Sequence, residues 1–259
     1  MTSQPTALVL RTAGTNCDRE TVQALEMAGA RTELLHLNAL SAEPRRLAAA
    51  QILVIPGGFS YGDYVAAGRI LGHELRHRLG EEIATFVEGG GFVLGICNGF
   101  QVLVELGLIE GPRAEPSQRR MALTANSSNR FESRWVHLRN ERSACEWLER
   151  GTVWPVPVAH GEGRVALRSA GDLEALTDAG QVALRYVTAD GGEAGYPDCP
   201  NGSAGQIAGL CDPSGRVLGL MPHPERNITP FHHPFWTRLP ERDEGEGLAL
   251  FRGLVSAAS

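Results

Sequence analysis

The sequence predicts an α/β protein with a flavodoxin-like, doubly wound, mostly parallel sheet and a smaller mixed or antiparallel sheet region. The first half alternates short apolar runs with helical patterns, which is typical of parallel strands joined by crossover helices. Residues 120–170 and 181–222 instead hold short strands punctuated by Gly and Pro, which indicates antiparallel pairing. Because 259 residues contain no repeat and no linker, we expect one domain over residues 1–259.

In the first half, each strand is an apolar run that ends in turn residues. The helix after the first strand has Asp18 as its expected N-cap and Gly29 as its expected stop signal. The expected strands are 7–10, 31–37, 51–58 (ending in a Pro-Gly-Gly turn) and 91–96, and the expected helices are 18–29, 68–79, 81–90 and 98–109.

In the second half, the strands are shorter and alternate apolar with polar positions. The polar, glycine-rich segment 188–205 predicts a loop, and the amphipathic segment 246–258 predicts a closing helix. The expected strands are 134–139, 153–160, 163–167, 181–186, 206–212 and 216–221, with a short helix at 171–180.

Composition excludes several classes of function. The net charge of −6 gives no electrostatic reason to bind nucleic acid or an anionic membrane. All 24 Lys and Arg residues are Arg, so mechanisms that need a lysine are excluded. No apolar run is long enough to span a membrane, and the first residues lack the pattern of a signal peptide. Five scattered cysteines, none in a C-x-x-C pair, predict a cytoplasmic protein without a disulfide framework or a metal site.

The segment G-I-C-N-G places Cys97 between a buried strand and a helix. Because Gly95 and Gly99 have no Cβ, they avoid steric clashes on either side of such a bend, as in the nucleophile elbow of hydrolases. A thiol presented there would be activated by the helix N-terminus or by a neighbouring imidazolium. A buried cysteine that acts as a small hydrophobe fits the same five residues, and the motif alone leaves both interpretations open.

A base for this thiol is predicted at His223, which follows an apolar strand between Pro222 and Pro224. Glu225 is two residues further, and in an extended chain positions i and i+2 project to one face. A carboxylate there would orient the imidazole and stabilise the imidazolium. A simple turn with a surface glutamate is the alternative for these residues taken alone.

An oxyanion site is predicted at Gly57 and Gly58, the paired glycines that end strand 51–58, because their backbone N–H groups are sterically free to converge on a ligand. Taken alone, Pro-Gly-Gly is an ordinary turn. In a doubly wound sheet, however, this loop and the cysteine bend both lie at the carboxyl ends of strands, where ligands bind.

Three motifs make the chain resemble the class I (triad-type) glutamine amidotransferases: PGGFSYGDYVAAG, GICNGFQVLVELGLI and MPHPER. Four more resemble the family of glutaminase subunits of phosphoribosylformylglycinamidine synthase, from purine biosynthesis: GTNCDRE, NRFESRWV, PVAHGEGR and PNGS followed by IAGL. Together they extend from about Gly14 to Arg226, most of the chain.

The resemblance implies that Cys97 attacks the side-chain amide of L-glutamine. His223 would protonate the departing ammonia and then activate water, with Glu225 orienting it. The oxyanion would rest on the backbone N–H groups of Gly58 and Asn98. The residues implied near bound glutamine are Gln101, Asn129, Arg130, Phe131 and Glu132, whereas Cys17 would be structural.

The resemblance also implies partners. The sequence contains no phosphate-binding glycine-lysine loop, so no cofactor is expected in this chain. A large synthetase subunit would bind ATP and Mg²⁺, receive the ammonia and aminate formylglycinamide ribonucleotide, and a small accessory subunit would complete the complex.

Two segments depart from the compact pattern of this family, an insertion at 188–199 and a long tail at 227–246, and either could alter subunit docking. The alternatives to the purine function are a stand-alone cysteine hydrolase of γ-glutamyl amides and an amidotransferase subunit of another synthetase.

Overall fold

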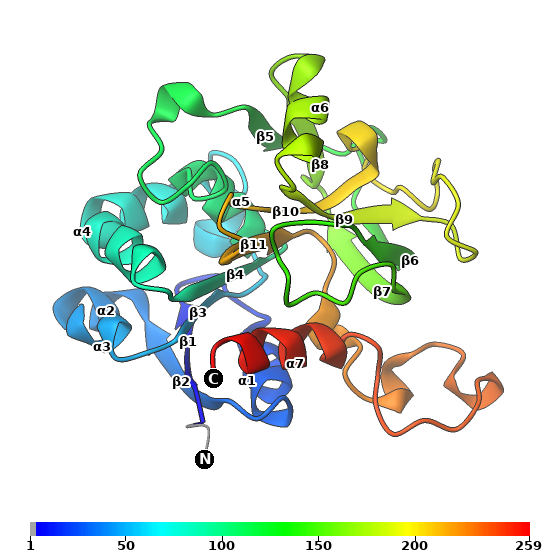
Figure 1. The fold of residues 1–259 in the computed structure, drawn as a ribbon, viewed down its shortest axis with the longest axis horizontal. Coiled ribbons are helices and arrows are strands. Elements are labelled where there is room, and N and C mark those ends of the chain that lie inside the picture. Colours follow the sequence, from blue (N-terminus) through cyan, green and yellow to red (C-terminus); the bar gives the residue numbers. More distant parts are fainter. Residues whose placement is uncertain (1–3) are drawn as a thin grey trace.

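The computed structural model describes residues 4–259, so the first three residues of the predicted domain lie outside the described residues. Nine strands form one sheet in the order β2-β1-β3-β4-β11-β10-β9-β6-β7, and β5 pairs with β8 in a separate two-stranded sheet (Figure 1). The strands are β1 (Thr6–Arg11), β2 (Arg31–His36), β3 (Ile52–Ile55), β4 (Phe92–Ile96), β5 (Met121–Thr124), β6 (Glu132–Asn140), β7 (Val153–His160), β8 (Arg164–Leu167), β9 (Val182–Val187), β10 (Ile207–Cys211) and β11 (Val217–Leu220).

The main sheet has a parallel half and an antiparallel half. Strands β2, β1, β3, β4 and β11 pair with one another in parallel, which confirms the predicted flavodoxin-like arrangement. Strands β10, β9, β6 and β7 extend this sheet with antiparallel pairing. The predicted antiparallel region is therefore mostly a continuation of the large sheet, and only β5 and β8 form the smaller one.

Helices cover both faces of the parallel half (Figure 1). Helix α1 packs against β1 and α7, whereas α4 packs against α5, α3 and β4. Strands β3 and β4 are buried along their whole length, as expected for parallel strands covered on both faces. The helices are α1 (Asp18–Met27), α2 (Leu37–Ala42), α3 (Arg45–Ala48), α4 (Arg69–Glu88), α5 (Asn98–Leu106), α6 (Gly171–Asp178) and α7 (Leu248–Ala257).

Two local predictions were wrong. The N-cap of α1 is Cys17, and Asp18 is instead the first helical residue, with its carboxylate 3.4 Å from the Arg11 guanidinium. The two helices predicted around Gly80 are one continuous helix, α4, because this glycine has helical backbone and costs only about 1 kcal/mol there.

The insertion and the tail flank strand β6 (Figure 1). The guanidinium of Arg134 lies 4.9 Å from the ring centre of Tyr196 in the insertion. The ring of the next residue, Trp135, lies 4.9 Å from that of His233 in the tail. Among the described residues, no helix combines the length and apolar character needed to cross a membrane.

Candidate active site

Cys97 occupies the predicted bend between β4 and α5. Its backbone has φ 51° and ψ −105°, a conformation that non-glycine residues rarely adopt and that marks functional sites. A Cβ on Gly99 would lie 1.9 Å from the carbonyl oxygen of Ile55, and one on Gly95 would lie 2.6 Å from that of Gly99. The predicted bend is therefore confirmed, because close backbone contacts require both glycines, whereas a nucleophilic role for Cys97 stays a prediction.

His223 and Glu225 form a buried pair just after β11. Nδ1 of His223 lies 2.7 Å from Oε1 of Glu225, and both side chains are at most 2% exposed. The two residues meet through a 3₁₀ turn at Pro224–Arg226, not through an extended chain as predicted. Because a carboxylate only accepts, Nδ1 carries the proton, and the lone pair of the neutral ring is on Nε2.

The pKa of His223 is set by burial and by negative charge. Burial alone would lower it, but the carboxylate of Glu225 and the thiolate form of Cys97 raise it well above its usual value. Nε2 has no hydrogen-bond partner among the described residues. A negative charge on Cys97 would therefore stabilise the imidazolium, and Nε2 stays free for proton transfer.

The two glycines after β3 have different roles in the packing. Gly58 has φ 145°, and a Cβ there would lie 2.6 Å from the carbonyl oxygen of Gly14. A Cβ on Gly57 would lie 2.9 Å from Cε1 of His223, so this glycine makes room for the imidazole. Asn98 is the first residue of α5, so its N–H is among those without an acceptor in the helix. Oxyanion binding by these groups stays a prediction.

The side chains of Asn98 and Gln101 are buried and tie the elbow to neighbouring loops. Asn98 accepts from the N–H of Ser60 at 3.2 Å and donates to Oε1 of Gln101 at 3.0 Å. Nε2 of Gln101 donates to the carbonyl oxygen of Glu162. These bonds fix the start of α5 against the loop after β3. Contact between Gln101 and glutamine stays a prediction.

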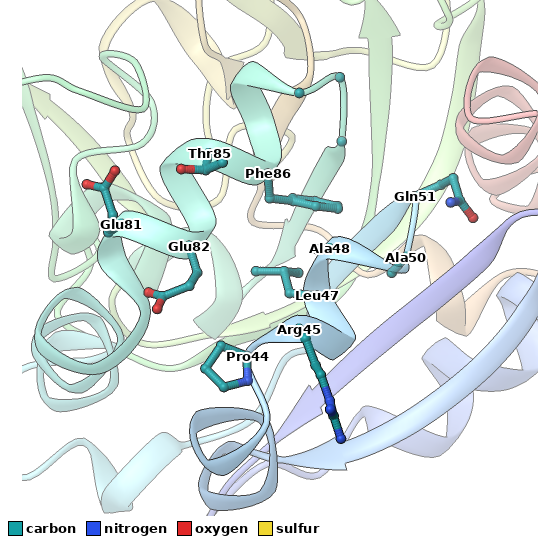
Figure 2. A pocket seen from close by; sticks show the side chains of 13 residues that line it. Pro44, Arg45, Leu47, Ala48, Ala50, Gln51, Glu81, Glu82, Thr85 and Phe86 are labelled. Carbon is teal, nitrogen blue, oxygen red and sulfur yellow. The ribbon is translucent and has the colours of Figure 1, made fainter.

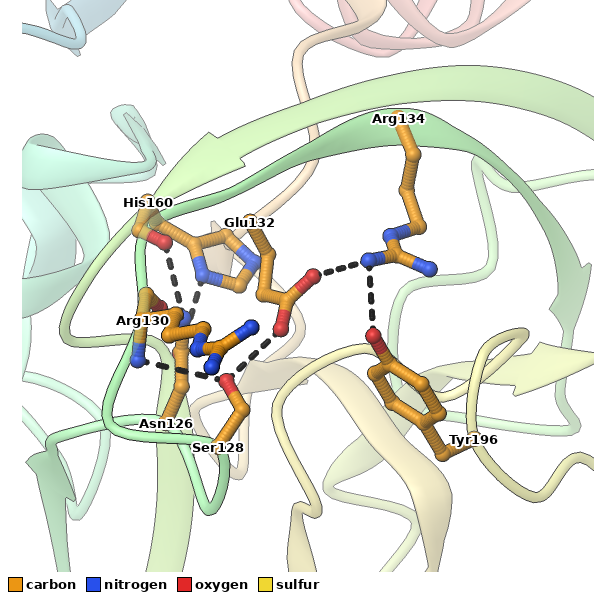
Figure 3. Close-up of polar contacts among 7 residues, drawn as sticks. All are labelled: Asn126, Ser128, Arg130, Glu132, Arg134, His160 and Tyr196. Atoms are coloured by element: carbon orange, nitrogen blue, oxygen red, sulfur yellow. Dashed lines mark hydrogen bonds and ion pairs between the residues drawn. The ribbon is translucent and has the colours of Figure 1, made fainter.

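The predicted glutamine-binding residues Asn129, Arg130 and Phe131 lie on an exposed turn before β6. The next residue, Glu132, points inward and accepts a hydrogen bond of 2.7 Å from Ser128, and it pairs with Arg134 (Figure 3). These contacts lower the pKa of Glu132, with the Ser128 hydrogen bond contributing most. The turn therefore joins an exposed surface to a buried carboxylate.

His160 is a buried histidine that sequence reasoning did not single out. It faces Glu132 across the β6–β7 pair, and the carbonyl oxygen of its neighbour Ala159 lies 3.7 Å from Sγ of Cys97. Burial, followed by the charge of His223, lowers the pKa of His160 to about 4. His160 is the histidine of the PVAHGEGR motif, but its position near the site follows only from the pairing of β6 with β7.

Cys17 was predicted to be structural, yet the fold brings it close to His223 and Glu225. Cys17, His223 and Glu225 each present a ligand-type atom, and these atoms lie within 4.8 Å of one another. A metal ion does not fit well there, because Nη2 of Arg226 donates to Sγ of Cys17 at 3.0 Å and so places a positive charge beside the sulfur.

A groove of about 580 Å³ lies between α3 and the end of α4 (Figure 2). Gln51 and Gly91 line it, and they directly precede β3 and β4. The groove is therefore at the amino ends of these strands, whereas Cys97 and Gly57 follow their carboxyl ends. It is not part of the candidate active site.

Comparisons with known proteins agree with this geometry. A sequence model of the CobB/CobQ-like glutamine amidotransferase domain matches residues 4–256. The chain is 45% identical to phosphoribosylformylglycinamidine synthase subunit PurQ of Dehalococcoides mccartyi, over 99% of this chain and 98% of that protein. It is 40% identical to the PurQ subunit of Methanococcus maripaludis C5, over 89% and 86% of the two chains. Its fold is similar to a chain of PurLQS from Thermotoga maritima, with a TM-score of 0.72, 32% identity and coverage of 98% and 99%.

Proposed function

Because this chain belongs to the CobB/CobQ-like glutamine amidotransferase domain family, we propose that it is the glutaminase subunit of a phosphoribosylformylglycinamidine synthase. It hydrolyses L-glutamine to glutamate and ammonia and passes the ammonia to a synthetase subunit. The observation that carries this proposal is the strained backbone of Cys97 beside the buried His223–Glu225 pair. The PurQ relatives, similar over nearly the whole chain, support the purine pathway over other amidotransferases.

The first half-reaction forms a thioester. The Cys97 thiolate attacks the γ-carboxamide carbon of glutamine, and the backbone N–H groups of Gly58 and Asn98 hold the oxyanion. The His223 imidazolium donates its Nε2 proton to the amide nitrogen, the C–N bond breaks and ammonia leaves. Glu225 keeps the imidazole oriented and stabilises its charged form, as its contact with Nδ1 supports.

The second half-reaction restores the enzyme. Neutral His223 takes a proton from water through Nε2, and the hydroxide adds to the γ-glutamyl thioester. The C–S bond then breaks, Cys97 leaves as a thiolate beside the imidazolium, and the new carboxylic acid loses its proton to solvent. The raised pKa of His223 supports the imidazolium form that this step restores.

The synthetase partner uses the ammonia. We expect ATP and Mg²⁺ to bind to that larger subunit, where formylglycinamide ribonucleotide is converted to the amidine, and we expect a small accessory subunit to complete the complex. The comparison chain from Thermotoga maritima comes from a PurLQS structure, which supports such an assembly. The insertion at 188–199 and the tail at 227–246 are candidate docking elements, since both project beside β6 (Figure 1).

The test is to reconstitute the complex with Cys97→Ser. Synthesis with glutamine should be lost, whereas synthesis with added ammonium salt should be retained, because the synthetase site is intact. Cys145→Ser is the matched control, since this cysteine is also buried but lies elsewhere, with its sulfur against the carbonyl oxygen of Gly215. Full glutaminase activity of the isolated chain, with no stimulation by a synthetase, would favour a stand-alone hydrolase instead.

A further inference from the structure

The segment Ala13–Cys17, within and just before the GTNCDRE motif, packs directly on the loop after β3. The N–H of Phe59 donates to the carbonyl oxygen of Gly14 at 2.9 Å, and the N–H of Tyr61 donates to that of Ala13 at 2.8 Å. The N–H of Cys17 donates in turn to the carbonyl oxygen of Gly57 at 3.2 Å. The backbone of this segment therefore fixes the loop that carries the oxyanion glycines, although no step of the reaction uses it.

The sulfur of Cys17 is held beside the catalytic imidazole. Its thiol donates to Oδ1 of Asn16 at 3.1 Å, and Nη2 of Arg226 donates to it at 3.0 Å. Because the guanidinium can only donate, a sulfur lone pair is the acceptor there. Sγ also lies 4.0 Å from Nδ1 of His223, at the outer limit of an N–H···S contact.

The imidazole of His223 thus lies in a narrow space bounded by Glu225, Cys17 and Gly57. Glu225 contacts Nδ1 on one side, and Cys17 faces the same nitrogen from another. A Cβ on Gly57 would lie 2.9 Å from Cε1 of His223 and 3.1 Å from Sγ of Cys17, so this backbone closes the space. Two acceptors facing Nδ1 favour the tautomer with the proton on Nδ1, which leaves Nε2 free for the substrate.

From this geometry we propose that Cys17 is a positioning residue, whose anchored sulfur holds His223 in its reactive orientation and tautomer. This inference rests on the proposed glutaminase function, but it concerns a residue that does not touch the substrate. Arg226 contributes by keeping the sulfur in place, and the elbow and the oxyanion loop are aligned with the imidazole through the same short segment.

The expected pH effect follows from the groups around the imidazole. Loss of the Cys17 acceptor destabilises the imidazolium, so His223 would lose its proton at a lower pH. The titratable and charged groups around His223 are Glu225 and Arg226 on its own turn, Cys97 at the elbow, Cys17 before α1 and His160 on β7. All except Cys17 stay in place in the variants proposed for the test.

The experiment uses the reconstituted complex and compares Cys17→Ala with Cys17→Ser. Cys17→Ala should lower kcat for glutamine about tenfold with little change in KM, a fraction of the 10²–10⁴ typical of a catalytic base. The basic limb of its pH profile should move to lower pH. Cys17→Ser keeps an acceptor and should recover most of both effects. Cys145→Ala, a buried cysteine away from the site, should change neither.

Unchanged kcat and pH profile in Cys17→Ala would overturn the inference. So would equal losses in Cys17→Ala and Cys17→Ser without a pH shift, since that pattern indicates a packing role. If Cys17→Ala does not assemble, Cys17→Val carries the test, because valine fills the space of the sulfur without an acceptor and should change kcat and the pH profile in the same direction. Failure of the proposed function is separate, since it would appear as a wild-type complex that cannot use glutamine.

Discussion

The carboxylate of Glu225 lies 2.7 Å from Nδ1 of His223, and both side chains are buried. A buried carboxylate this close stabilises the imidazolium more than it would in water, because little solvent screens the interaction. Among the groups that raise the pKa of His223, Glu225 has the largest effect. The proposed mechanism depends on this contact in both half-reactions.

Glu225→Gln should therefore separate orientation from charge. The amide keeps the size of the side chain but removes its negative charge, so kcat for glutamine should fall by about 10²–10⁴ while KM changes little. The measurement is steady-state synthesis by the complex with glutamine or with ammonium salt. Activity with ammonium salt is the internal control and should remain. A loss below about threefold would show that the carboxylate is not part of the catalytic unit.

Gly99→Ala should lower the free energy of unfolding by disrupting the bend at Cys97. The new Cβ would lie 1.9 Å from the carbonyl oxygen of Ile55, so β3 and α5 would have to separate. We expect a loss of about 3–5 kcal/mol in the free energy of unfolding, measured by urea titration. Gly171→Ala is the matched control, because a Cβ there meets no atom within 4 Å. Equal stability of the two variants would contradict the packing described for Cys97.

His160 should make the free energy of unfolding depend on pH. Its pKa is about 4 in the folded chain against 6.5 ordinarily, so between these values the unfolded chain binds more protons. Stability should thus fall as pH decreases through this window, by about 3 kcal/mol at pH 4.

Urea unfolding of wild type and His160→Gln at pH 7 and pH 4 measures this term, which should be missing from the variant. His77→Gln, at an exposed position on α4, controls for the loss of a histidine. An identical pH dependence in wild type and His160→Gln would refute the assignment.

Arg130→Ala and Phe131→Ala test the predicted glutamine contacts. Both residues are exposed, so substitution should leave the free energy of unfolding within about 0.5 kcal/mol of wild type. If they contact glutamine, its KM should rise several-fold with kcat nearly unchanged, because only uniform binding is lost. The measurement is glutaminase kinetics of the complex, with exposed Arg168→Ala as a control for surface charge. An unchanged KM in both variants would remove these residues from the site.

Local features of the site could be predicted because local sterics dictate them. Gly95 and Gly99 flank Cys97 at the spacing that a strand–helix bend requires, and the bend has that form. The parallel half of the sheet was predictable for a similar reason, since buried apolar runs alternate with helices. The His223–Glu225 contact was also predicted, although a 3₁₀ turn produces it instead of an extended strand.

Long-range packing could not be predicted in this way. Cys17 and His223 are separated by 206 positions, and nothing in the spacing of either segment indicates that they meet. The position of His160 depends on the register of β6 and β7, which pairs it with Glu132. Continuity between the parallel and antiparallel strands depends on how β10 pairs with β11, which short alternating runs do not specify.

The most direct test of the central claim is to map the covalent intermediate. The complex is mixed with glutamine, quenched rapidly in acid and digested, and each of the five cysteines is examined by mass spectrometry. The account predicts a γ-glutamyl thioester on Cys97 alone, absent from Cys97→Ser. A γ-glutamyl group on Cys17, or glutamine hydrolysis that persists in Cys97→Ser at the wild-type rate, would contradict it.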